Sequence, residues 1–435
     1  MRSSISESEQ GSEISSGCPA ERGVSLAPFA SSAVIPTHVP AECVVDIDVY
    51  HMPGADRDFL TPWKHLQDSS AAGIFWTPRN GGHWIVTRGR EIARIYADHE
   101  NFSSRIVMVP REVCEQFQLR PTTLDPPEHR PYRRLMSAAL SPAVVHSVQP
   151  VIRQLAIDTI ERFRLRGHCE FISEFAERLP IAVFMHLADL PVEDSTAMPK
   201  CAEELIHADG TRSETPIIER FAAYLRPYVV QRQKHPGDDL ISKLVGGILD
   251  GRPLTEDEAV EVSTAMMTGG LDTVVSSLGL MLAFVARSPD HRRSLIEKPA
   301  VIRSAVAEML RRFPIMTKAR LLRHDQVVEG VTLKAGDVVM LPPLQGLDDR
   351  EFDHPLTVDF DRRPAPHLTF GNGVHRCPGA TLTQAELEIT LQEWLARIPE
   401  FEIDPMQELV TQGGVLGAVL RLGLRWDPAS TKAMD

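Results

Sequence analysis

The sequence predicts a single large fold that is mainly α-helical and carries small β-sheets. Helical spacing of apolar residues dominates the chain after Thr87, whereas strand-forming patterns are few and short. No internal repeat, low-complexity block or change of composition marks a second domain. With 435 residues, of which 43% are hydrophobic, the chain can bury a core large enough to enclose a cofactor.

The net charge and the cysteines indicate which kinds of partner and which cellular compartment to expect. The formal net charge is −13, from 46 Lys and Arg against 59 Asp and Glu, which argues against nucleic acid as the main partner. No apolar run approaches roughly eighteen residues, so we expect neither a membrane anchor nor a signal peptide. The cysteines form no C-x-x-C pair and predict reduced thiols and a cytoplasmic location; they are Cys18, Cys43, Cys114, Cys169, Cys201 and Cys377.

The elements follow in order along the chain. Residues 1–30 are rich in Ser and Glu, lack apolar periodicity and predict a disordered tail. Residues 36–53 predict an extended packing segment. Residues 74–86 predict a β-hairpin, because aromatic and β-branched residues flank the turn Asn80-Gly81-Gly82. Further on, Pro and Gly separate predicted helices, and residues 330–341 and 413–424 predict short strands.

A long helix is predicted from Thr255 to Arg287, with two adjacent glycines in its middle. Gly269 and Gly270 cost about 2 kcal/mol of helix propensity relative to alanine, so another interaction has to offset them. One explanation is close packing of a second helix. The other is that the helix bends or passes close to a ligand, which leaves a backbone carbonyl free beside the carboxylate and hydroxyl of Asp272 and Thr273.

The stretch from Phe370 to Gly379 carries one cysteine in a glycine-rich turn before a predicted helix. Pro378 fits the first helical position, which would make Cys377 the N-terminal cap. The positive end of the helix dipole would then favour a thiolate, which can bind a metal through sulfur. Gly371 would let the loop lie close against a flat group. The alternative is a buried structural thiol or a zinc ligand.

This loop resembles the haem-binding loop of the cytochrome P450 family, F-G-x-G-x-H/R-x-C-x-G, at every fixed position. The resemblance covers the chain from about Pro40 onward and implies that residues 31–435 form one haem-thiolate domain. Haem b would be buried between the long oxygen-binding helix and the cysteine-loop helix. The resemblance makes Cys377 the axial thiolate ligand of the iron and places four other loop residues around the cofactor: Phe370, Gly371, His375 and Gly379.

Two further family motifs lie upstream in the expected order. Gly269 to Thr273 is similar to the oxygen-binding motif G-G/A-x-D/E-T, which implies that Thr273 positions dioxygen and its water while Asp272 feeds protons toward them. Glu308 and Arg311 match the family's E-x-x-R pair, and Arg362 would complete a structural charge network with them. The spacing of Glu308 and Arg311 by itself is more typical of a solvated surface pair.

Four basic residues match positions that hold the haem propionates in this family. His129 and Arg133 resemble its H-x-x-x-R pair, and Arg320 and His375 match two further propionate contacts. Each of them alone would fit a surface cation. Their convergence on one dianionic ligand is what the resemblance implies.

Several segments resemble the soluble bacterial camphor hydroxylase subgroup, but expected pocket positions differ from it. Phe117 stands where that enzyme has a tyrosine whose hydroxyl bonds camphor, and Ala265 and Thr268 stand where it has leucine and valine. Lys318 replaces an aspartate near a propionate. A wider, mostly apolar pocket favours a small terpenoid or norisoprenoid ketone, such as an ionone-like molecule, over camphor. The other pocket residues that the resemblance implies are Met108, Thr122, Gly269, Met316, Val415 and Leu416.

The resemblance implies a haem-thiolate monooxygenase that hydroxylates an unactivated C–H bond with O2. No flavin or ferredoxin module is recognisable in the sequence, so electrons would come from a [2Fe–2S] ferredoxin and its flavin reductase. The ferredoxin would dock on a basic patch of Arg88, Arg130, Arg133 and Arg376. We expect a monomer without membrane or nucleic-acid partners. The alternatives are camphor hydroxylation, a haem-thiolate peroxygenase or dehydratase, which typically lacks the Asp-Thr pair, and a gas-binding haem sensor.

Overall fold

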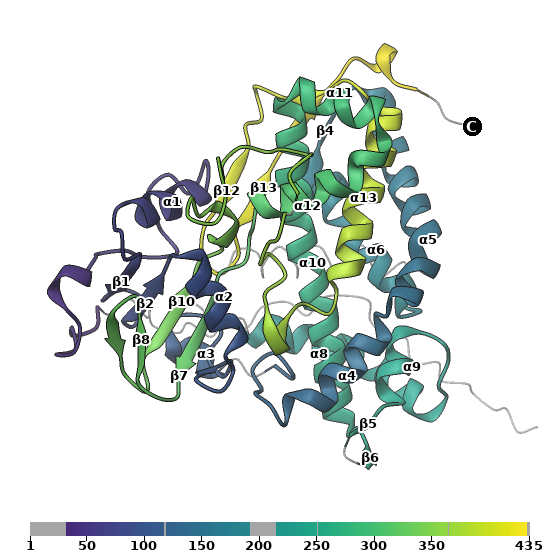
Figure 1. Ribbon diagram of the computed structural model, residues 1–435. Helices are drawn as coiled ribbons and strands as arrows, with labels where there is room; N and C mark the ends of the chain where they lie inside the picture. Colours follow the sequence, from purple (N-terminus) through teal and green to yellow (C-terminus); the bar gives the residue numbers. More distant parts are fainter. Residues whose placement is uncertain (1–31, 117–118, 192–214, 250, 364, 433–435) are drawn as a thin grey trace, which may run out of the picture.

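A β-rich region lies on one side of the molecule and a larger helical region on the other (Figure 1). The computed structural model describes residues 32–116, 119–191, 215–249, 251–363 and 365–432. The architecture confirms the predicted fold class, mainly helical with several small sheets. The tail predicted for residues 1–30 lies outside the described residues.

Helices make up most of the described chain. The α-helices are α1 (Leu60–Asp68), α2 (Gly89–Ala97), α3 (Arg111–Gln116), α4 (His129–Ala139), α5 (Pro142–Glu161), α6 (Arg178–Leu187), α8 (Thr215–Lys234), α9 (Leu240–Val245), α10 (Glu256–Arg287), α11 (Pro289–Glu297), α12 (Ile302–Arg312) and α13 (Ala380–Arg397). A π-helical turn, Ile172–Ala176, precedes α6.

The strands are short. They are β1 (Ile74–Thr77), β2 (His83–Val86), β3 (Phe102–Ser103), β4 (His168–Glu170), β5 (Ile248–Leu249), β6 (Arg252–Pro253), β7 (Lys318–Leu322), β8 (Gln326–Val328), β9 (Val331–Leu333), β10 (Val338–Leu341), β11 (Glu402–Ile403), β12 (Val410–Gln412), β13 (Ala418–Arg421) and β14 (Gly423–Arg425). The stretch predicted at 330–341 thus contains β9 and β10, and the stretch at 413–424 contains β13 and most of β14.

The largest sheet has the strand order β1-β2-β10-β7-β3. Its first two strands form the predicted hairpin, with Ile74 opposite Val86 and positive φ angles through the turn residues Asn80, Gly81 and Gly82. β10 pairs in parallel with β2 and antiparallel with β7, and β7 also pairs with β3. The sheet therefore joins segments from the first and last thirds of the chain and fixes the position of β7.

α10 is the central helix of the molecule and runs between the other helices in Figure 1. It begins with a capping box, in which the Thr255 side chain accepts from the Glu258 N–H and the Glu258 carboxylate accepts from the Thr255 N–H. Its first half, up to Leu271, packs into one apolar cluster, and its second half, from Val274, packs into another. The segment from Gly269 to Thr273 lies where these two clusters meet.

By length and composition, α10 could also cross a membrane, because an 18-residue window has a mean hydropathy of 1.6. However, 72% of this window is buried inside the protein, as is typical of the core helix of a globular protein. The bent pair His129–Ala139 and Pro142–Arg166 passes the same test only if it is counted as one span.

Candidate cofactor and active site

The cysteine loop is held by its own backbone and packs against the end of α2. The Cys377 N–H donates to the Phe370 carbonyl at 2.8 Å. Gly371 and Gly373 have φ angles of +71° and +67°, which side chains with a Cβ rarely adopt. A Cβ on Gly373 would also lie 2.8 Å from the Tyr96 carbonyl oxygen. The two glycines therefore allow both the turn and its close approach to α2.

The loop differs from the prediction at the start of the following helix. α13 begins at Ala380 and has Gly379 as its N-cap, so Cys377 lies before the cap and Pro378 is not the first helical residue. Burial raises the pKa of the Cys377 thiol above its usual value, although hydrogen bonds from the Gly379 and Ala380 N–H groups act in the opposite direction. The N–H groups at the helix end therefore favour the thiolate, as predicted, but desolvation outweighs their effect on the pKa. A bound metal ion would deprotonate this thiol.

The opposite wall of the site is formed by α10. Both Gly269 and Gly270 have open space where a Cβ would project, with nothing within 4 Å. Close packing of a second helix therefore does not explain the glycine pair. Thr273 lies one turn after Gly269, and its hydroxyl donates to the Gly269 carbonyl at 3.0 Å. Asp272 is buried, with 4% of its surface exposed.

A ladder of hydroxyl groups runs along α10 through this wall. Thr264, Thr268, Thr273 and Ser277 each donate to the carbonyl oxygen four residues earlier, at 2.7–3.0 Å. Such side-chain bonds compete with the helical N–H groups for the same carbonyls and bend helices. The free carbonyl expected next to the glycines is therefore occupied by a side chain, that of Thr273.

The cysteine loop and α10 enclose one cavity of about 250 Å³. Cys377 of the loop and Gly269 and Thr273 of α10 all line it. Among the predicted loop residues, Phe370, Gly371 and His375 also line the cavity, whereas Gly379 does not. A Cβ on Gly379 would nevertheless lie 3.8 Å from the Cys377 sulfur.

The four predicted propionate contacts all line this cavity. They come from α4 (His129 and Arg133), from β7 (Arg320) and from the cysteine loop (His375). The two imidazole rings lie 4.2 Å apart, centre to centre. Burial, with smaller effects from neighbouring cations, lowers the pKa of His129 to about 4 and that of His375 to about 3. At neutral pH both rings are uncharged donors beside two permanent cations.

Three buried polar atoms of the cavity wall have no hydrogen-bond partner among the described residues. They are the Ser104 Oγ, His129 Nδ1 and His375 Nε2 atoms. Buried polar groups are rarely left unpaired, so these atoms indicate a ligand with acceptor oxygens. Two propionates would supply such oxygens, and the open space beside Gly269 would accommodate a flat ring. The residues therefore fit haem.

Only some of the residues predicted for the substrate pocket line the cavity. Thr122, Gly269 and Met316 line the cavity. The side chains that do not line it are Met108, Ala265, Thr268, Val415 and Leu416. Leu416 forms a β-bridge with the lining residue Met316, and the Val415 carbonyl accepts at 2.8 Å from the N–H of Thr317, the residue after Met316. Phe117 lies outside the described residues.

Sequence reasoning missed several apolar lining residues, among them Val107, Ile315 and Leu368. Val107 takes the place expected for its neighbour Met108, and Ile315 lies beside Met316. Adjacent apolar residues in an extended segment point in opposite directions, and the pattern alone does not say which one faces the ligand.

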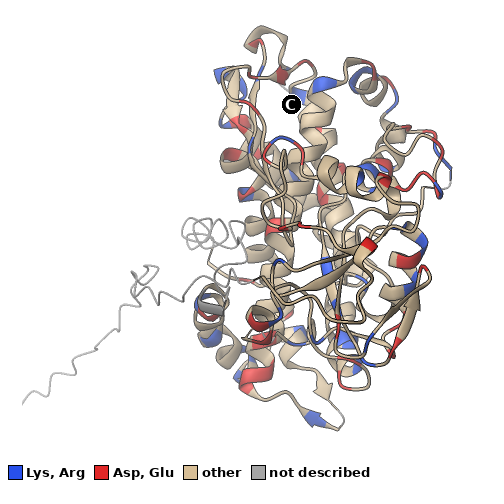
Figure 2. Cartoon of the chain, turned by 90° about the vertical axis from the view of Figure 1, so that its left-hand side faces the viewer, with Lys and Arg blue, Asp and Glu red and all other residues tan. Residues whose placement is uncertain are grey.

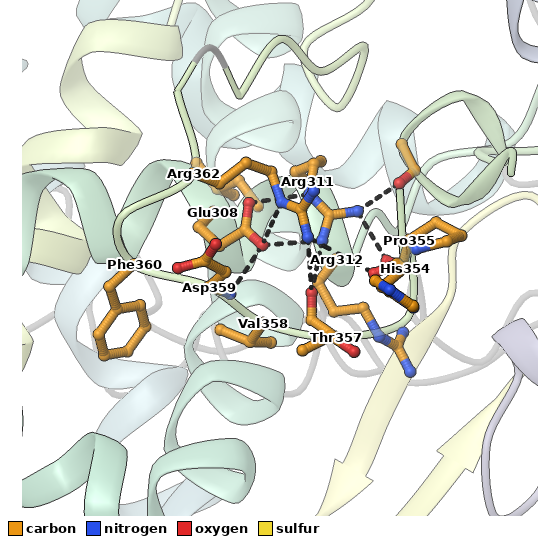
Figure 3. Close-up of polar contacts among 12 residues, drawn as sticks. Glu308, Arg311, Arg312, His354, Pro355, Thr357, Val358, Asp359, Phe360 and Arg362 are labelled. Atoms are coloured by element: carbon orange, nitrogen blue, oxygen red, sulfur yellow. Dashed lines mark hydrogen bonds and ion pairs between the residues drawn. The ribbon is translucent and has the colours of Figure 1, made fainter. Parts of the chain in front are cut away.

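Glu308, Arg311 and Arg362 meet in a buried network (Figure 3). Glu308 bonds Arg311 through both carboxylate oxygens at 2.8 Å and Arg362 at 3.1 Å. The Arg311 guanidinium also donates to the carbonyls of Pro355 and Thr357. Glu308 and Arg311 are 1% and 0% exposed, which excludes the solvated surface pair. The network joins α12 to the segment that leads to the cysteine loop.

One member of the expected docking patch is not available on the surface. Arg88 is only 6% exposed, donates to the carbonyls of Gln67 and Ser70, and lies 3.5 Å from the Asp348 carboxylate. The prediction that Arg88 belongs to the docking patch was wrong, because these partners hold its guanidinium group inside the fold. Arg130 and Arg376 are exposed, and Arg133 is half-buried.

Within the described parts of the chain, no group of three or more His, Cys, Asp or Glu residues could hold a metal ion. A structural zinc site needs about four such ligands. The zinc alternative for Cys377 is therefore not supported, whereas a single thiolate suffices for iron that a porphyrin already holds.

Comparisons with known proteins agree with this geometry. Residues 215–412 match the family model described as Cytochrome P450. The chain is 30% identical over 408 residues to "Probable cytochrome P450 127A1" of Sinorhizobium fredii, an alignment that covers 90% of this chain and 97% of that protein. It is 28% identical over 380 residues to "Mycinamicin IV hydroxylase/epoxidase" of Micromonospora griseorubida, covering 84% of this chain and 94% of the relative.

Solved structures are similar over almost the whole chain. The structure of CYP101J2 superimposes with a TM-score of 0.85 at 39% identity, and that of CYP101C1 with a TM-score of 0.84 at 37% identity. Each comparison covers 91% of this chain and 100% of the other.

Proposed function

The chain belongs to the cytochrome P450 family, and from this premise we propose that it hydroxylates an unactivated C–H bond of a small apolar terpenoid or ionone-like norisoprenoid. Membership makes the protein a monooxygenase that binds haem b through a cysteine thiolate. The expected likeness to the camphor hydroxylase subgroup of soluble bacterial members is confirmed. One observation carries the proposal: Cys377 of the cysteine loop and Thr273 of α10 line the same cavity.

Cys377 would hold the iron, and Arg133, Arg320, His129 and His375 would hold the propionates. Haem with an axial thiolate supplies cleavage of the O–O bond and insertion of one oxygen atom into a C–H bond. The bidentate guanidinium groups suit carboxylates, and the neutral imidazoles donate further hydrogen bonds. His129 and Arg320 are buried, which strengthens their contacts because little water competes for them.

Thr273 is assigned the positioning of dioxygen and water. Because its hydroxyl proton is already donated to the Gly269 carbonyl, the oxygen keeps its lone pairs for a donor in the cavity, such as a water molecule. Asp272, the next side chain on α10, is assigned the transfer of protons toward that water. These two roles favour a monooxygenase over a gas-binding sensor, which would need neither group.

The substrate class is supported by the apolar wall above the cysteine. Val107, Met316 and Leu368 line the cavity together with the backbone of Gly269. A pocket with such walls and few polar groups fits a small hydrophobic molecule. Ala265 and Thr268, from which the sequence predicts a wider pocket, are buried on α10 and do not line the cavity, so the proposed substrate class is supported by the apolar wall without them.

The proposed electron donor is a [2Fe–2S] ferredoxin reduced by a flavin reductase. Family members of this subgroup use separate redox partners. We place the docking surface at the exposed Arg130 and Arg134 of α4 and Arg376 of the cysteine loop. This surface lies on the cysteine side of the cavity, where an electron has the shortest path to the cofactor.

The proposal includes a monomeric state and a cytoplasmic location. None of the described cysteines Cys43, Cys114, Cys169 and Cys377 forms a disulfide, which supports a reducing compartment.

The first test is the absorption spectrum of the reduced, carbon monoxide-bound protein. We expect the red-shifted band of a thiolate-ligated haem, and its loss in Cys377→Ser. A wild-type protein without this band would contradict the cofactor assignment.

The second test is titration of the ferric protein with a panel of terpenoids, followed by turnover with O2, ferredoxin and reductase. We expect the largest spin-state change and hydroxylated product with ionone-like ketones. The largest change with camphor would instead favour camphor hydroxylation. Turnover with peroxide that exceeds ferredoxin-supported turnover would favour a peroxygenase.

A further inference from the structure

Residues 119–124 form a thin part of the cavity wall. They lie outside the regular helices and strands and are folded mainly into turns. Pro121 and Thr122 line the cavity, whereas the side chain of Arg120, directly before them, is 40% exposed to solvent. Because neighbouring residues face the cavity and the solvent, one layer of backbone separates the two at this place.

Few polar contacts join this segment to the rest of the protein. The N–H and the hydroxyl of Thr123 both donate to the Leu119 carbonyl, so these hydrogen bonds stay inside the segment. Among the residues that the structure describes, one ion pair links residues 119–124 to a distant part of the chain. In it, the Arg120 guanidinium donates to the Glu261 carboxylate at 2.5 Å.

The two ends of the segment are held differently. Directly after it, the buried Asp125 carboxylate accepts from the Ser104 N–H at 2.8 Å and from the Ser103 hydroxyl, which fixes this end to β3. The other end depends on Arg120 and Glu261, whose side chains are 40% and 34% exposed. An ion pair of this exposure contributes little stability, so it can open without unfolding of the core.

The partner of Arg120 lies on a well-anchored part of α10. One turn before Glu261, the Glu258 carboxylate accepts two hydrogen bonds from Arg252 at 2.7 Å and one from the Tyr132 hydroxyl at 2.9 Å. These contacts fix the start of α10, the helix that also lines the cavity. The ion pair of Arg120 with Glu261 therefore ties the thin wall to this helix.

We infer that the Arg120–Glu261 ion pair holds residues 119–124 closed over the cavity and thereby sets how fast small molecules enter and leave it. When the pair is broken, the segment can move away from α10 while Asp125 keeps its other end in place. Entry and exit then become faster together, whereas the closed state that binds the ligand keeps its shape. Arg120 and Glu261 are positioning residues in this scheme, because they act through Pro121 and Thr122.

The experiment uses 4-phenylimidazole, whose imidazole nitrogen binds ferric haem and shifts its absorption band. Stopped-flow absorbance gives the association and dissociation rate constants for the haem-loaded wild type, Arg120→Gln, Glu261→Gln and the charge-swapped variant Arg120→Glu/Glu261→Arg. The control is Arg252→Gln, since Arg252 is 53% exposed and pairs with the same end of α10 but does not line the cavity. Haem content and the carbon monoxide spectrum are recorded for each variant.

Arg120→Gln and Glu261→Gln should each raise both rate constants roughly two- to fivefold, as expected for a partly exposed ion pair, with little change in the dissociation constant. The charge-swapped variant should return both rate constants close to the wild-type values, which lost packing at either position would not do. Higher ionic strength should also speed both steps in the wild type but not in Glu261→Gln, because salt screens exposed charges. Arg252→Gln should behave as the wild type.

Wild-type rate constants in both single variants would overturn the inference. A change in the dissociation constant without a joint change of the two rates would also overturn it and assign Arg120 to the shape of the cavity. Because 4-phenylimidazole is not the substrate, the result is independent of the proposed substrate class.

Hydrogen exchange of the backbone of residues 119–124 is the second measurement, and it decides the question for any variant that takes up less haem. Faster exchange of this segment in Glu261→Gln, reversed in the charge-swapped variant, supports the inference. Exchange equal to that of the wild type rejects it.

Discussion

Burial and hydrogen bonding act in opposite directions on the Cys377 thiol. Desolvation raises its pKa, whereas N–H groups of Gly379 and Ala380 and the neighbouring Arg133 and Arg376 lower it. Burial thus favours the protonated thiol, and the N–H groups would donate to the sulfur of a thiolate bound to iron. Donors to a metal-bound thiolate set how much electron density the sulfur gives to the metal.

Thr273→Ala should lower the amount of hydroxylated product formed per electron consumed. The variant loses the hydroxyl to which we assign the positioning of water, but it keeps Cys377 and the proposed propionate contacts. Haem content and substrate dissociation constant should stay near the wild-type values, while more of the consumed electrons appear as hydrogen peroxide. The ratio of product to NADH consumed measures this. Thr273→Ser, which keeps a hydroxyl at the same position, is the control. An unchanged ratio of product to NADH in Thr273→Ala would contradict the role assigned to Thr273.

His83 gives the protein a pH-dependent stability. Its ring is 1% exposed on β2, and desolvation lowers its pKa to about 4. Above pH 6.5 the ring is neutral in both folded and unfolded chains, so it contributes nothing to the pH dependence. Between pH 6.5 and 4 the unfolded chain takes up a proton that the folded chain refuses, which costs about 3 kcal/mol of stability by pH 4.

His83→Gln should therefore lose less stability than the wild type as the pH falls from 7 to 4. Urea unfolding at each pH measures the difference, and His51→Gln, at an exposed site, is the control. Parallel stability curves for His83→Gln and wild type would show that His83 does not titrate in this window.

At the scale of elements, α10 combines a helix-weakening sequence with a position in the centre of the core. Its capping box and the two apolar clusters stabilise it on both sides of the glycine pair. The glycines and the back-bonded hydroxyls lie between these clusters, where the helix forms the cavity wall. Packing at the two ends thus stabilises a continuous helix whose middle has low helix propensity.

Gly269→Ala and Gly270→Ala form a matched pair of variants. They separate the effect of glycine on helix stability from its effect on the cavity wall. Neither added methyl group would meet an atom within 4 Å, so both variants should gain about 0.5–1 kcal/mol of stability from helix propensity. Only Gly269 lines the cavity, so only Gly269→Ala should also weaken substrate binding, by several-fold. Urea unfolding and spin-state titration measure the two effects. If both variants weakened substrate binding equally, the assignment of Gly269 alone to the cavity wall would be contradicted.

α12 is the second element whose role depends on buried charge. Arg311 is fully buried and joins Glu308 to carbonyls of the segment before the cysteine loop. Removing it would leave the Glu308 carboxylate with Arg362 as its remaining charged partner, away from water.

Arg311→Met should lower the free energy of unfolding by about 3–5 kcal/mol, the cost of breaking a buried ion pair. Haem retention should fall with it, since the network supports the cysteine loop. Arg303→Met, at an exposed site on the same helix, should change stability by less than about 0.5 kcal/mol. Urea unfolding measures both variants, and a wild-type value for Arg311→Met would show that the network contributes no stability.

Over the molecule as a whole, basic and acidic residues are mixed and do not form separate large patches in the described part of the chain (Figure 2). Figure 2 shows Lys and Arg interspersed with Asp and Glu over helices and loops. A local basic surface on a protein of net charge −13 can attract an acidic ferredoxin only at short range. The proposed docking site therefore depends on the few exposed arginines near Cys377.

The double variant Arg130→Glu/Arg134→Glu should slow reduction by ferredoxin roughly tenfold at low ionic strength, since steering falls when charges are reversed. Stopped-flow reduction under carbon monoxide measures the rate at two salt concentrations. Arg293→Glu on α11, 64% exposed, should leave the rate unchanged. Reduction of the wild type that is indifferent to salt would argue against an electrostatic docking surface.

The sequence by itself determined the fold class, the hairpin at 74–86, the extent of α10 and the identity of the cysteine loop. These follow from local patterns, because turn chemistry, periodicity and motif spacing act within a few residues. The tertiary structure decided which side chains face the cavity. It placed Lys318 and Val107 in the wall, left Met108 out of it and buried Arg88, because the direction of a side chain depends on strand pairing and packing between distant segments.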